Sequence, residues 1–472
     1  MKVDLYHLYR SFHFSKLAYP IALDVLKVWA ESMGWEARVS ICKETRVDLD
    51  TDAAAIGISV YSQTAPAAYR VGAELRRRGK IVIFGGPHFR GPSTFAEAAP
   101  YCDVIVSTTC EEQWQTLLRG IENGDVRPNR PKPLTITDTA NRFRYPHDFY
   151  QSLKSRRWYQ IPTIPTSIGC PYDCDFCAAF MQGKYILRDI ETIHNEVAQA
   201  SPKMVIMCDA TFGLNKKFTI ELMHALAPLK KKIAVEITLG RLKDLELLDA
   251  LAKGGVRWLV VGIETLDTKL RKHGTVDLDE GLRRVLDAAH ERGMMMQGNF
   301  ICGMDTDGPE TFEQIYRYYE RSTLDAIMMG ILTPYPDTEL YRRLEREGRI
   351  IDRDWEHYDC HHVVYRPRGM TVDQLIDGYV ELYRNVRQHK SVFREIVDGW
   401  RRSGVGLESA VMVGINAYQK FDSVKKRRLL RQNQRELALA AHDAAAPDAG
   451  PLSSAAAAGR IGALSSAVRT SA

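Results

Sequence analysis

Three cysteines within eight residues are the first feature of this sequence that could do chemistry. Cys170, Cys174 and Cys177 lie in the segment SIGCPYDCDFCAAF. Structural zinc sites close with four ligands, usually as two CxxC pairs, and a CxxxCxxC spacing without a nearby fourth cysteine does not fit that pattern. Thiolates also hold cubane iron–sulfur clusters, and three of them would leave one iron open for a small-molecule ligand. We therefore predict a 4Fe–4S cluster, with a zinc-binding or coincidental cysteine group as the competing interpretation.

The composition of the chain excludes several classes of protein. The chain has 472 residues, of which 45% are hydrophobic and 26% charged, and its net charge is +5. The small net charge does not indicate a nucleic-acid partner. We find no apolar stretch long enough to cross a bilayer and no signal-peptide pattern at the start, so we expect a cytoplasmic protein. The other six of the nine cysteines are scattered, and each is interpreted as a small buried hydrophobic residue.

Short apolar runs alternate with helical patterns through the first part of the chain. Gly34 and Gly79 follow the two clearest helical patterns and predict helix ends. Such strand–helix alternation predicts a doubly wound parallel sheet of the Rossmann-like kind in residues 1–125. The expected strands cover residues 3–8, 36–41, 54–61, 80–86 and 103–108, and the expected helices cover residues 18–34 and 65–79.

A second alternating series predicts an open barrel in residues 161–350. Six βα units are too few for a closed eight-stranded barrel, so we expect a partial (β/α)6 barrel of the TIM type. The three cysteines directly follow its first strand and should lie at the C-terminal face, where barrel sites are built. The expected strands cover residues 164–168, 204–208, 233–238, 258–264, 295–303 and 326–335.

The remaining segments are expected to have less regular structure. Residues 126–160 are rich in Pro, Arg and aromatic residues and are interpreted as a linker. Residues 351–430 are predicted to be a helical C-terminal region, and the Ala-rich residues 431–472 a disordered tail. The predicted fold class is α/β, with a Rossmann-like sheet, a partial barrel and a helical region in that order.

CxxxCxxC after the first strand of a six-unit barrel resembles the radical S-adenosylmethionine (radical SAM) enzymes, over roughly residues 160–350. In that family the open iron of a 4Fe–4S cluster is chelated by S-adenosylmethionine (SAM). Its reductive cleavage gives a 5'-deoxyadenosyl radical that removes a hydrogen atom from the substrate. The resemblance implies that Cys170, Cys174 and Cys177 hold the cluster and that Phe176 packs beside the adenine.

The same resemblance assigns further residues to the C-terminal ends of the barrel strands. Asp209, Thr211 and Asn215 would lie near the methionine part of SAM, although Asp209 could be a turn residue and Asn215 a helix cap. Arg241 would hold the SAM carboxylate, or is an ordinary surface arginine. Glu264 follows a buried apolar run and would contact the ribose. The matches are completed by three residues at the last two strand ends, which are Asn299, Ile301 and Tyr335.

The N-terminal segments GISVYS and FGGPH resemble the radical SAM subgroup that carries a cobalamin-binding-like domain. Ser59, Gly85 and Gly86 would line the ligand site, because glycines permit close approach of the backbone. The DxHxxG segment, whose histidine ligates cobalt in many cobalamin proteins, is absent. Three alternatives stay open: cobalamin bound without a histidine ligand, a vestigial domain, or a Rossmann-like domain retained for packing.

These features predict a radical enzyme that opens an unactivated C–H bond of a small metabolite, as in secondary metabolism such as antibiotic biosynthesis. The favoured reaction is cobalamin-dependent C-methylation. The alternatives are cobalamin-free dehydration or rearrangement of a sugar or aminocyclitol, and a non-catalytic cluster-binding module. An electron donor such as flavodoxin or ferredoxin is the expected partner. Cys208 and Tyr335 are assigned catalytic roles, with Cys208, Cys302 and Cys360 as candidate hydrogen-atom donors to a substrate radical.

Overall fold

The computed structural model describes residues 1–9, 22–107, 110–137, 161–177, 185–200, 204–267 and 280–389. The chain divides into the units Met1–Arg427 and Arg428–Ala472, and the second unit lies outside the described residues. The predicted tail, the helical region beyond residue 389 and most of the predicted linker therefore lie outside them too. Within the described ranges, no helix is long and apolar enough to span a membrane.

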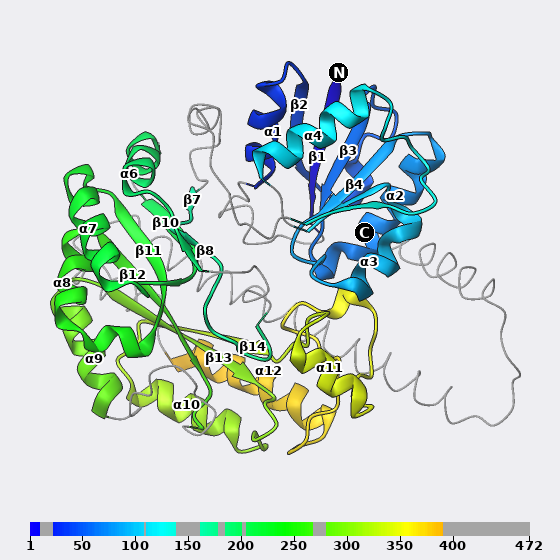
Figure 1. The fold of residues 1–472 in the computed structure, drawn as a ribbon. Coiled ribbons are helices and arrows are strands. Elements are labelled where there is room, and N and C mark those ends of the chain that lie inside the picture. The colour runs from blue at the N-terminus through cyan, green and yellow to red at the C-terminus, as the bar shows by residue number, and fades with distance from the viewer. Residues whose placement is uncertain are drawn as a thin grey trace, which may run out of the picture. The chain divides into compact units, whose positions relative to one another are not determined.

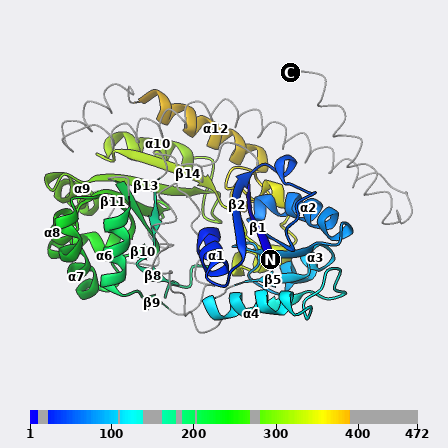
Figure 2. The same ribbon diagram turned by 90° about the horizontal axis from the view of Figure 1, so that it is seen from above.

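The N-terminal part is the predicted doubly wound parallel sheet (Figure 1). Its strand order is β2-β1-β3-β4-β5-β6, and helices cover both faces, with α1 and α4 on one and α2 and α3 on the other (Figure 2). The strands are β1 (Lys2–Leu8), β2 (Glu36–Cys42), β3 (Ala55–Ser59), β4 (Ile81–Gly85), β5 (Val104–Val106) and β6 (Leu134–Ile136). The helices are α1 (Ala22–Glu31), α2 (Ala65–Arg77), α3 (Pro92–Ala98) and α4 (Glu111–Glu122).

Local sequence signals set the helix ends of this domain, as predicted. Gly34 has φ 83° after α1, and Gly79 has φ 73° after α2, a backbone region that glycine enters without steric cost. The domain differs from expectation at its end. The segment interpreted as a linker contributes β6, a sixth strand that pairs in parallel with β5.

The second sheet is the predicted open barrel. Six parallel strands run in the order β14-β13-β12-β11-β10-β7 (Figure 1). They are β7 (Thr163–Ile164), β10 (Met204–Phe212), β11 (Lys232–Thr238), β12 (Val256–Glu264), β13 (Met295–Cys302) and β14 (Ala326–Ile331). The helices outside them are α6 (Ile190–Gln199), α7 (Lys216–Leu226), α8 (Leu245–Lys253), α9 (Glu280–Glu291) and α10 (Thr311–Arg321). The expected first strand is divided, because β8 (Ser167–Ile168) leaves the sheet and pairs antiparallel with β9 (Ile186–Leu187).

An apolar layer closes the inner face of the barrel at the N-terminal ends of its strands. Ile206 and Val260 are partly buried and pack against this layer. Its buried members are Ile161, Met204, Ala234, Trp258, Met295 and Ala326. Side chains alternate between the two faces of a strand. The residues two, four or six positions beyond this floor therefore point into the barrel, toward its C-terminal rim.

The chain beyond the barrel is less helical than expected. It forms α11 (Glu339–Arg346), a short 3₁₀ helix η9 (Trp355–His357) and α12 (Val372–His389), with an isolated bridge between Ile350 and Tyr365. The α12 helix closes on the last barrel strand, because the Tyr379 and Tyr383 hydroxyls donate to the Met329 carbonyl at 3.0 and 2.9 Å.

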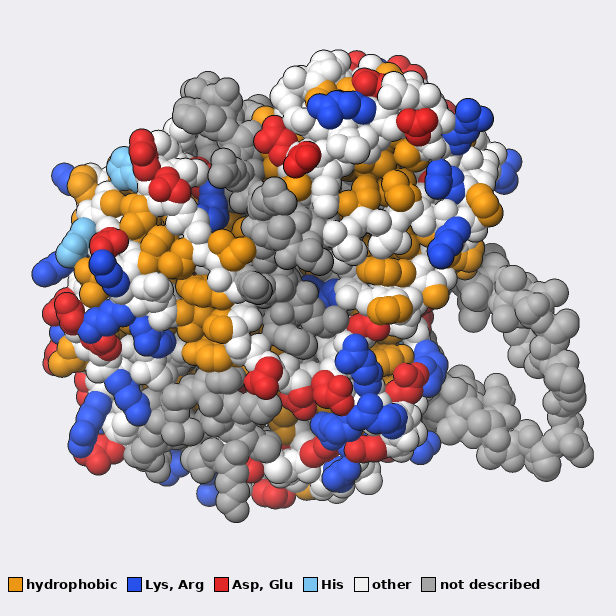
Figure 3. Space-filling view, in the orientation of Figure 1, with side chains coloured by type: hydrophobic (Ala, Val, Ile, Leu, Met, Phe, Trp, Pro, Cys, Tyr) orange, Lys and Arg blue, Asp and Glu red, His pale blue; other side chains and the backbone are white. Residues whose placement is uncertain are grey.

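The segment around α11 also binds the N-terminal domain. The Asp337 carboxylate accepts hydrogen bonds from the side chains of Ser93, at 2.8 Å, and Thr94, at 3.4 Å. The Trp355 indole N–H donates to Glu97 at 2.8 Å. We call residues 337–358 the clasp, since these contacts join the two sheets. Basic and acidic side chains intermingle around α11 (Figure 3).

A buried ion pair supports the start of the barrel. Arg188 and Glu196 have side chains only 6% and 7% exposed, and the guanidinium makes two hydrogen bonds to the carboxylate, at 2.5 and 3.0 Å. Arg188 also donates to the Pro165 carbonyl at 2.6 Å. Arg188→Ala should lower the free energy of unfolding by about 3–5 kcal/mol, because it leaves Glu196 buried without its cation. Urea unfolding of the chain without cofactors measures this loss.

The matched control replaces both partners. Arg188→Met with Glu196→Leu should recover most of the loss, since apolar pairs of similar volume replace buried ion pairs without penalty. If Arg188→Ala lowers the free energy of unfolding by less than about 1 kcal/mol, the pair contributes no more than an exposed salt bridge does, and the prediction is wrong.

Candidate active site

The cysteine loop lies at the C-terminal rim of the barrel. It leaves β8 through Gly169, which has φ 78°, and carries Cys170, Cys174 and Cys177 as half-buried thiols. The Cys177 N–H donates to the Cys174 carbonyl at 3.0 Å, which closes a tight turn around Phe176. Residues 178–184 lie outside the described part of the chain. The position of the thiols agrees with the expectation from the strand order.

One carboxylate organises the approach to this loop. Asp209 on β10 is buried, and it accepts hydrogen bonds from the backbone N–H and the hydroxyl of both Thr166 and Ser167. The two Thr166 bonds measure 3.1 and 3.0 Å. Burial raises the pKa of Asp209 although these bonds oppose the shift. Asp209 thus fixes the strand that leads into the cysteines, and its contact with SAM stays a prediction.

The opposite side of the loop is held by α11. The Leu340 N–H donates to the Asp175 carbonyl at 2.9 Å, and the Arg343 guanidinium lies 3.8 Å from the Asp175 carboxylate. Arg343 also pairs with Asp305 at 2.5 Å, in the loop after β13. The cysteine loop is therefore anchored both to the barrel and to the clasp.

The thiols fit a cluster better than a single ion. In the described residues, no three His, Cys, Asp or Glu side chains converge on a point that could hold one metal ion. A cubane gives each thiolate a separate iron, so its three ligands stand apart on an open loop. Cys170, Cys174 and Cys177 are half-buried thiols on such a loop, so they match the ligands that a cubane requires.

The inner face of the barrel borders an open space above the apolar floor. Cys208, Glu236 and Met328 point inward from mid-strand positions and are nevertheless exposed to solvent. Protein surrounds them on the other sides, and the resulting loss of bulk water raises the pKa of Cys208 to about 12. We call the space that these three side chains border the chamber.

Two carboxylates face this chamber from neighbouring strands. Glu264 ends β12 with φ 63°, and its carboxylate folds back over Gly262, where an added Cβ would lie 2.3 Å from its Oε1. Desolvation raises the pKa of both Glu236 and Glu264 to about 7, and the charge of Glu236 adds to the shift of Glu264. Glu236 was missed from sequence, although an acidic residue inside the apolar run IAVEIT was the available signal.

Other predicted residues lie along the rim but are engaged by the chain itself. Asn215 caps α7 by accepting from the Phe218 N–H at 3.0 Å, as its alternative interpretation proposed. The Thr211 hydroxyl donates to the Ala210 carbonyl at 2.7 Å, and Arg241 Nε donates to the Gly213 carbonyl at 2.9 Å. On β13, the Asn299 side chain accepts from Gln297 at 2.8 Å, and Ile301 is half-buried on the inner face.

The three candidate hydrogen-atom donors separate by location. Cys302 is fully buried on the helix-facing side of β13, whereas Cys208 borders the chamber. Cys360 has φ 64°, lies over Gly330 of β14, and its sulfur is 3.2 Å from the Tyr335 hydroxyl. Burial raises the pKa of Tyr335. The structure thus joins Tyr335 to Cys360, a pairing that sequence spacing did not indicate.

At the N-terminal sheet, the glycines serve the chain's own packing. Gly86 has φ 103°, and a Cβ there would lie 2.7 Å from the Val60 carbonyl oxygen, directly beyond Ser59. Gly85 lies against Val106, where a Cβ would be 3.2 Å from the carbonyl oxygen. These contacts by themselves account for both glycines, and their contact with a ligand stays a prediction. His88, two residues beyond Gly86, is buried between Tyr69 and Ser62, and burial lowers its pKa to about 3.

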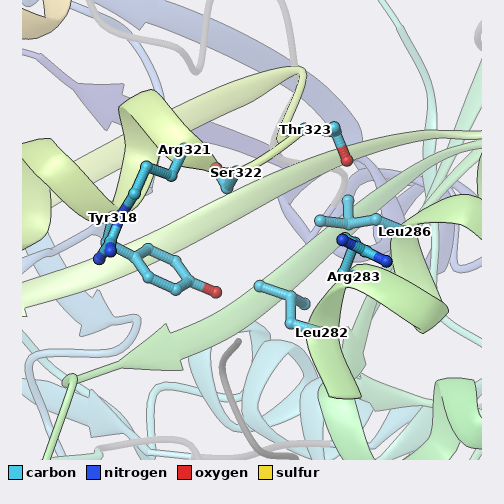
Figure 4. Close-up of a pocket in the computed structure, with 7 residues that line it drawn as sticks. All are labelled: Leu282, Arg283, Leu286, Tyr318, Arg321, Ser322 and Thr323. Atoms are coloured by element: carbon cyan, nitrogen blue, oxygen red, sulfur yellow. The ribbon is translucent and has the colours of Figure 1, made fainter. Parts of the chain in front are cut away.

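A small pocket of about 60 Å³ lies outside the barrel, between α9 and α10 (Figure 4). Tyr318 points its hydroxyl toward Leu282, while the charged ends of Arg283 and Arg321 point to opposite sides. The pocket does not gather these charges and contains none of the predicted site residues, so we assign it no part in the chemistry.

Comparison with known proteins agrees with this rim and barrel. Residues 164–319 match the Radical SAM superfamily, and residues 338–398 match a domain of unknown function, DUF4070. Bacteriochlorophyllide d C-12(1)-methyltransferase of Chlorobaculum tepidum is 24% identical over 72% of this chain and 76% of its own. An anaerobic magnesium-protoporphyrin IX monomethyl ester cyclase of Cereibacter sphaeroides is 25% identical over 70% of this chain and 58% of its own.

The fold is shared with a solved enzyme. The radical SAM methyltransferase TsrM of Kitasatospora setae, with cobalamin and a 4Fe–4S cluster bound, superposes with a TM-score of 0.57 and 18% identity, covering 73% of this chain and 75% of its own. The chain thus contains a radical SAM domain over residues 164–319, and domains of this superfamily use a 4Fe–4S cluster and SAM. More particularly, its sequence relatives include methyltransferases, and its fold neighbour TsrM is a radical SAM methyltransferase with cobalamin bound.

Asp209→Ala should loosen the cysteine loop. The substitution leaves the N–H and hydroxyl donors of Thr166 and Ser167 without their acceptor, and each orphaned buried donor costs about 1–3 kcal/mol. We expect a lower melting temperature and substantially less iron after anaerobic reconstitution. Thr211→Ala, on the same strand, is the control and should retain its iron. Wild-type iron content in Asp209→Ala would contradict an anchoring role.

Glu236→Gln should stabilise the cofactor-free chain at high pH. The folded-state pKa, about 7, lies above the ordinary value of 4.5, so the ionised carboxylate destabilises the fold increasingly as pH rises from 4.5 through 7. We expect a melting temperature about 1–3 °C above wild type at pH 8.5, and a difference that shrinks toward pH 5. Glu221→Gln, at a carboxylate 55% exposed on α7, is the surface control and should change the melting temperature little. An equal gain at both pH values would contradict the assignment.

Proposed function

We propose that this enzyme cleaves SAM reductively and uses the resulting 5'-deoxyadenosyl radical to abstract hydrogen from an unactivated C–H bond of a small metabolite, for cobalamin-dependent C-methylation. The observation that carries the proposal is the set of three half-buried thiols at the open rim of a six-stranded parallel barrel, above a solvent-accessible chamber. Such a rim is where barrel enzymes place reacting groups.

In this proposal Cys170, Cys174 and Cys177 hold the cluster, which when bound supplies the electron that cleaves SAM. Phe176 packs beside the adenine. Glu264, whose carboxylate faces the chamber, accepts hydrogen bonds from the ribose hydroxyls.

The remaining rim residues orient the same ligand. Arg241 uses its terminal nitrogens for the SAM carboxylate, because its Nε already donates to Gly213. Asn299 and Ile301 line the adenine side. The apolar floor excludes water from below, which protects a reactive radical from quenching.

The N-terminal domain supplies the proposed cobalamin site. Ser59, Gly85 and Gly86 lie at the carboxyl ends of β3 and β4, the edge where doubly wound sheets bind ligands. Support comes from the names of relatives, which include methyltransferases, and from the cobalamin-bound fold neighbour. The absence of a DxHxxG histidine implies cobalamin bound without that ligand.

Cobalamin-free dehydration or rearrangement is the second candidate. The specific observation in its favour is that Gly85 and Gly86 pack on Val106 and Val60, so neither glycine requires a ligand to explain it. In that reaction a hydrogen-atom donor facing the radical is useful, and Cys208 or the Tyr335–Cys360 pair would serve. One of the relatives is named a cyclase rather than a methyltransferase, which also supports a reaction other than methylation.

The electron source and compartment are part of the same proposal. A small one-electron protein such as flavodoxin or ferredoxin supplies the electron for SAM cleavage. An exposed cluster with an open iron is oxygen-sensitive, which favours the reducing cytoplasm.

The decisive experiment is anaerobic purification with iron, sulfide and cobalamin supplied, followed by metal analysis and assay of 5'-deoxyadenosine. We expect about four irons per chain and SAM cleavage in the presence of a reductant. Replacing Cys170, Cys174 and Cys177 by Ala should abolish both. Cys110→Ala, at a buried thiol of the N-terminal domain, is the control and should keep both.

Cobalt separates the two candidate reactions. Stoichiometric cobalt, with S-adenosylhomocysteine formed beside 5'-deoxyadenosine, supports methylation. Iron without cobalt supports dehydration or rearrangement. Zinc in place of iron, or a cluster without SAM cleavage, would refute the proposed function.

A further inference from the structure

Arg90 is a cation of the N-terminal domain that the proposed chemistry does not use. It lies five residues beyond the end of β4, in the loop that leads into α3. Its side chain is half-buried, and its Nε donates a hydrogen bond to the Pro87 carbonyl at 2.6 Å. That bond fixes the base of the guanidinium, so the charge has a defined place in the loop.

Contacts of the next residues bind this loop to the clasp. Gly91 lies directly against the Asp337 side chain, because an added Cβ at this glycine would overlap the carboxylate. Asp337 also accepts hydrogen bonds from Ser93 and Thr94 in the first turn of α3. The loop that carries Arg90 is thus tied to the segment that follows β14.

The same segment is bonded to the cysteine loop. The Leu340 N–H donates to the Asp175 carbonyl at 2.9 Å, and Asp175 lies two residues before Cys177. The start of the clasp therefore contacts both the loop after β4 and the loop that carries the thiols. This arrangement brings the N-terminal domain to the last cysteine of the site.

Electrostatic interactions place the Arg90 guanidinium itself beside that cysteine. Burial, the largest effect, lowers the pKa of Arg90, and interactions with Cys177, Tyr61 and Tyr335 oppose the shift. Of these three groups Cys177 acts most strongly on Arg90. An arginine side chain remains protonated in proteins, so the group near Cys177 carries a full positive charge.

We propose that Arg90 is a positioning residue that holds a positive charge beside Cys177 and thereby makes the iron–sulfur cluster easier to reduce. The reduced cluster carries one more electron than the oxidised cluster, so a nearby cation stabilises it, and net charge is one of the factors that set the potential of such clusters. The half-buried place of Arg90 matters because burial weakens screening by water and salt. The inference rests on the proposed function for the identity of the cluster ligands.

The charge comes from the N-terminal domain, whereas the thiols come from the barrel. In the proposed function, SAM cleavage begins with transfer of an electron to the cluster. Arg90 therefore gives the N-terminal domain a part in that first step, which does not depend on whether the domain binds cobalamin.

An anionic group of SAM or of the substrate is the alternative partner for this cation. The cluster is favoured because Cys177, one of its proposed ligands, is the strongest of the groups that interact with Arg90. A measurement made without SAM and without substrate separates these sources of negative charge.

The test is a redox titration of the full chain, reconstituted with iron and sulfide under anaerobic conditions, in which electron paramagnetic resonance reports the reduced cluster. The reference potential is the one at which half of the wild-type cluster is reduced. At this potential, Arg90→Gln should show a ratio of reduced to oxidised cluster about tenfold below wild type, because it removes one nearby charge. Arg90→Lys keeps the charge and should stay within about threefold of wild type.

Controls separate this role from a general effect of charge and from structural damage. Arg77→Gln removes an arginine of the same domain whose side chain is 71% exposed at the end of α2, and it should leave the titration unchanged. Arg90→Met is a second neutral variant, which keeps an apolar stem and decides the matter if Arg90→Gln does not take up iron. Iron content, 5'-deoxyadenosine formation and SAM affinity are measured on the same samples.

An unchanged titration in a neutral Arg90 variant that holds its full iron would overturn the inference, as would an Arg90→Lys variant shifted as far as Arg90→Gln. Loss of iron from both neutral variants would assign Arg90 a structural role and also overturn it. A loss of SAM affinity with an unchanged titration would assign the charge to SAM instead.

Failure of the proposed function is visible separately in the wild type. A wild-type chain that takes up no iron would refute the proposed function and this inference together. A wild-type cluster that cleaves SAM, with no change of the titration in the Arg90 variants, would refute this inference alone.

Discussion

The Asp209 carboxylate is the constraint on which the site depends. The cysteine loop has little regular structure of its own, and its direction is set where Thr166 and Ser167 converge their N–H and hydroxyl groups on that one carboxylate. The anion is stabilised by four donors in a buried place, and its burial is tolerated for that reason. Since Asp209 belongs to β10, the sheet, rather than the loop itself, determines where the cysteine loop begins and in which direction it runs.

The barrel interior has a polarity gradient from floor to rim. Met204, Trp258 and Met295 belong to the dry floor, Glu236 and Glu264 add negative charge above it, and the rim carries thiols and hydrogen-bonding groups. An open six-stranded arrangement allows this layering, because the inner face need not be filled by side chains from eight strands. In the proposed reaction, a radical formed at the rim would lie above an apolar floor whose side chains are buried.

The strands and helices could largely be predicted from the sequence, whereas the side-chain contacts of the site could not, because these contacts join distant segments of the chain. Periodicity and glycines predicted both sheets, and the CxxxCxxC spacing predicted that the cysteine loop lies at the barrel rim. The short β6 was missed because its side chains are largely exposed and carry little pattern. The roles of Asp209, Gly86 and the Tyr335–Cys360 pair depend on register and on contacts between distant segments, which a single sequence does not contain. Glu236 illustrates the same limit, since only strand register shows that it lies beside the strand that carries Glu264.

The clasp, residues 337–358, has a consequence for how such enzymes can be recombined. It follows the barrel in the chain, yet Asp337 bonds to α3 of the N-terminal domain, Trp355 bonds to Glu97, and Leu340 bonds to the cysteine loop. A chimera that exchanges only the N-terminal sheet would pair a foreign α3 with the native clasp and disturb the loop beside the thiols. The transferable module is therefore discontinuous, and it comprises the N-terminal sheet together with this later segment.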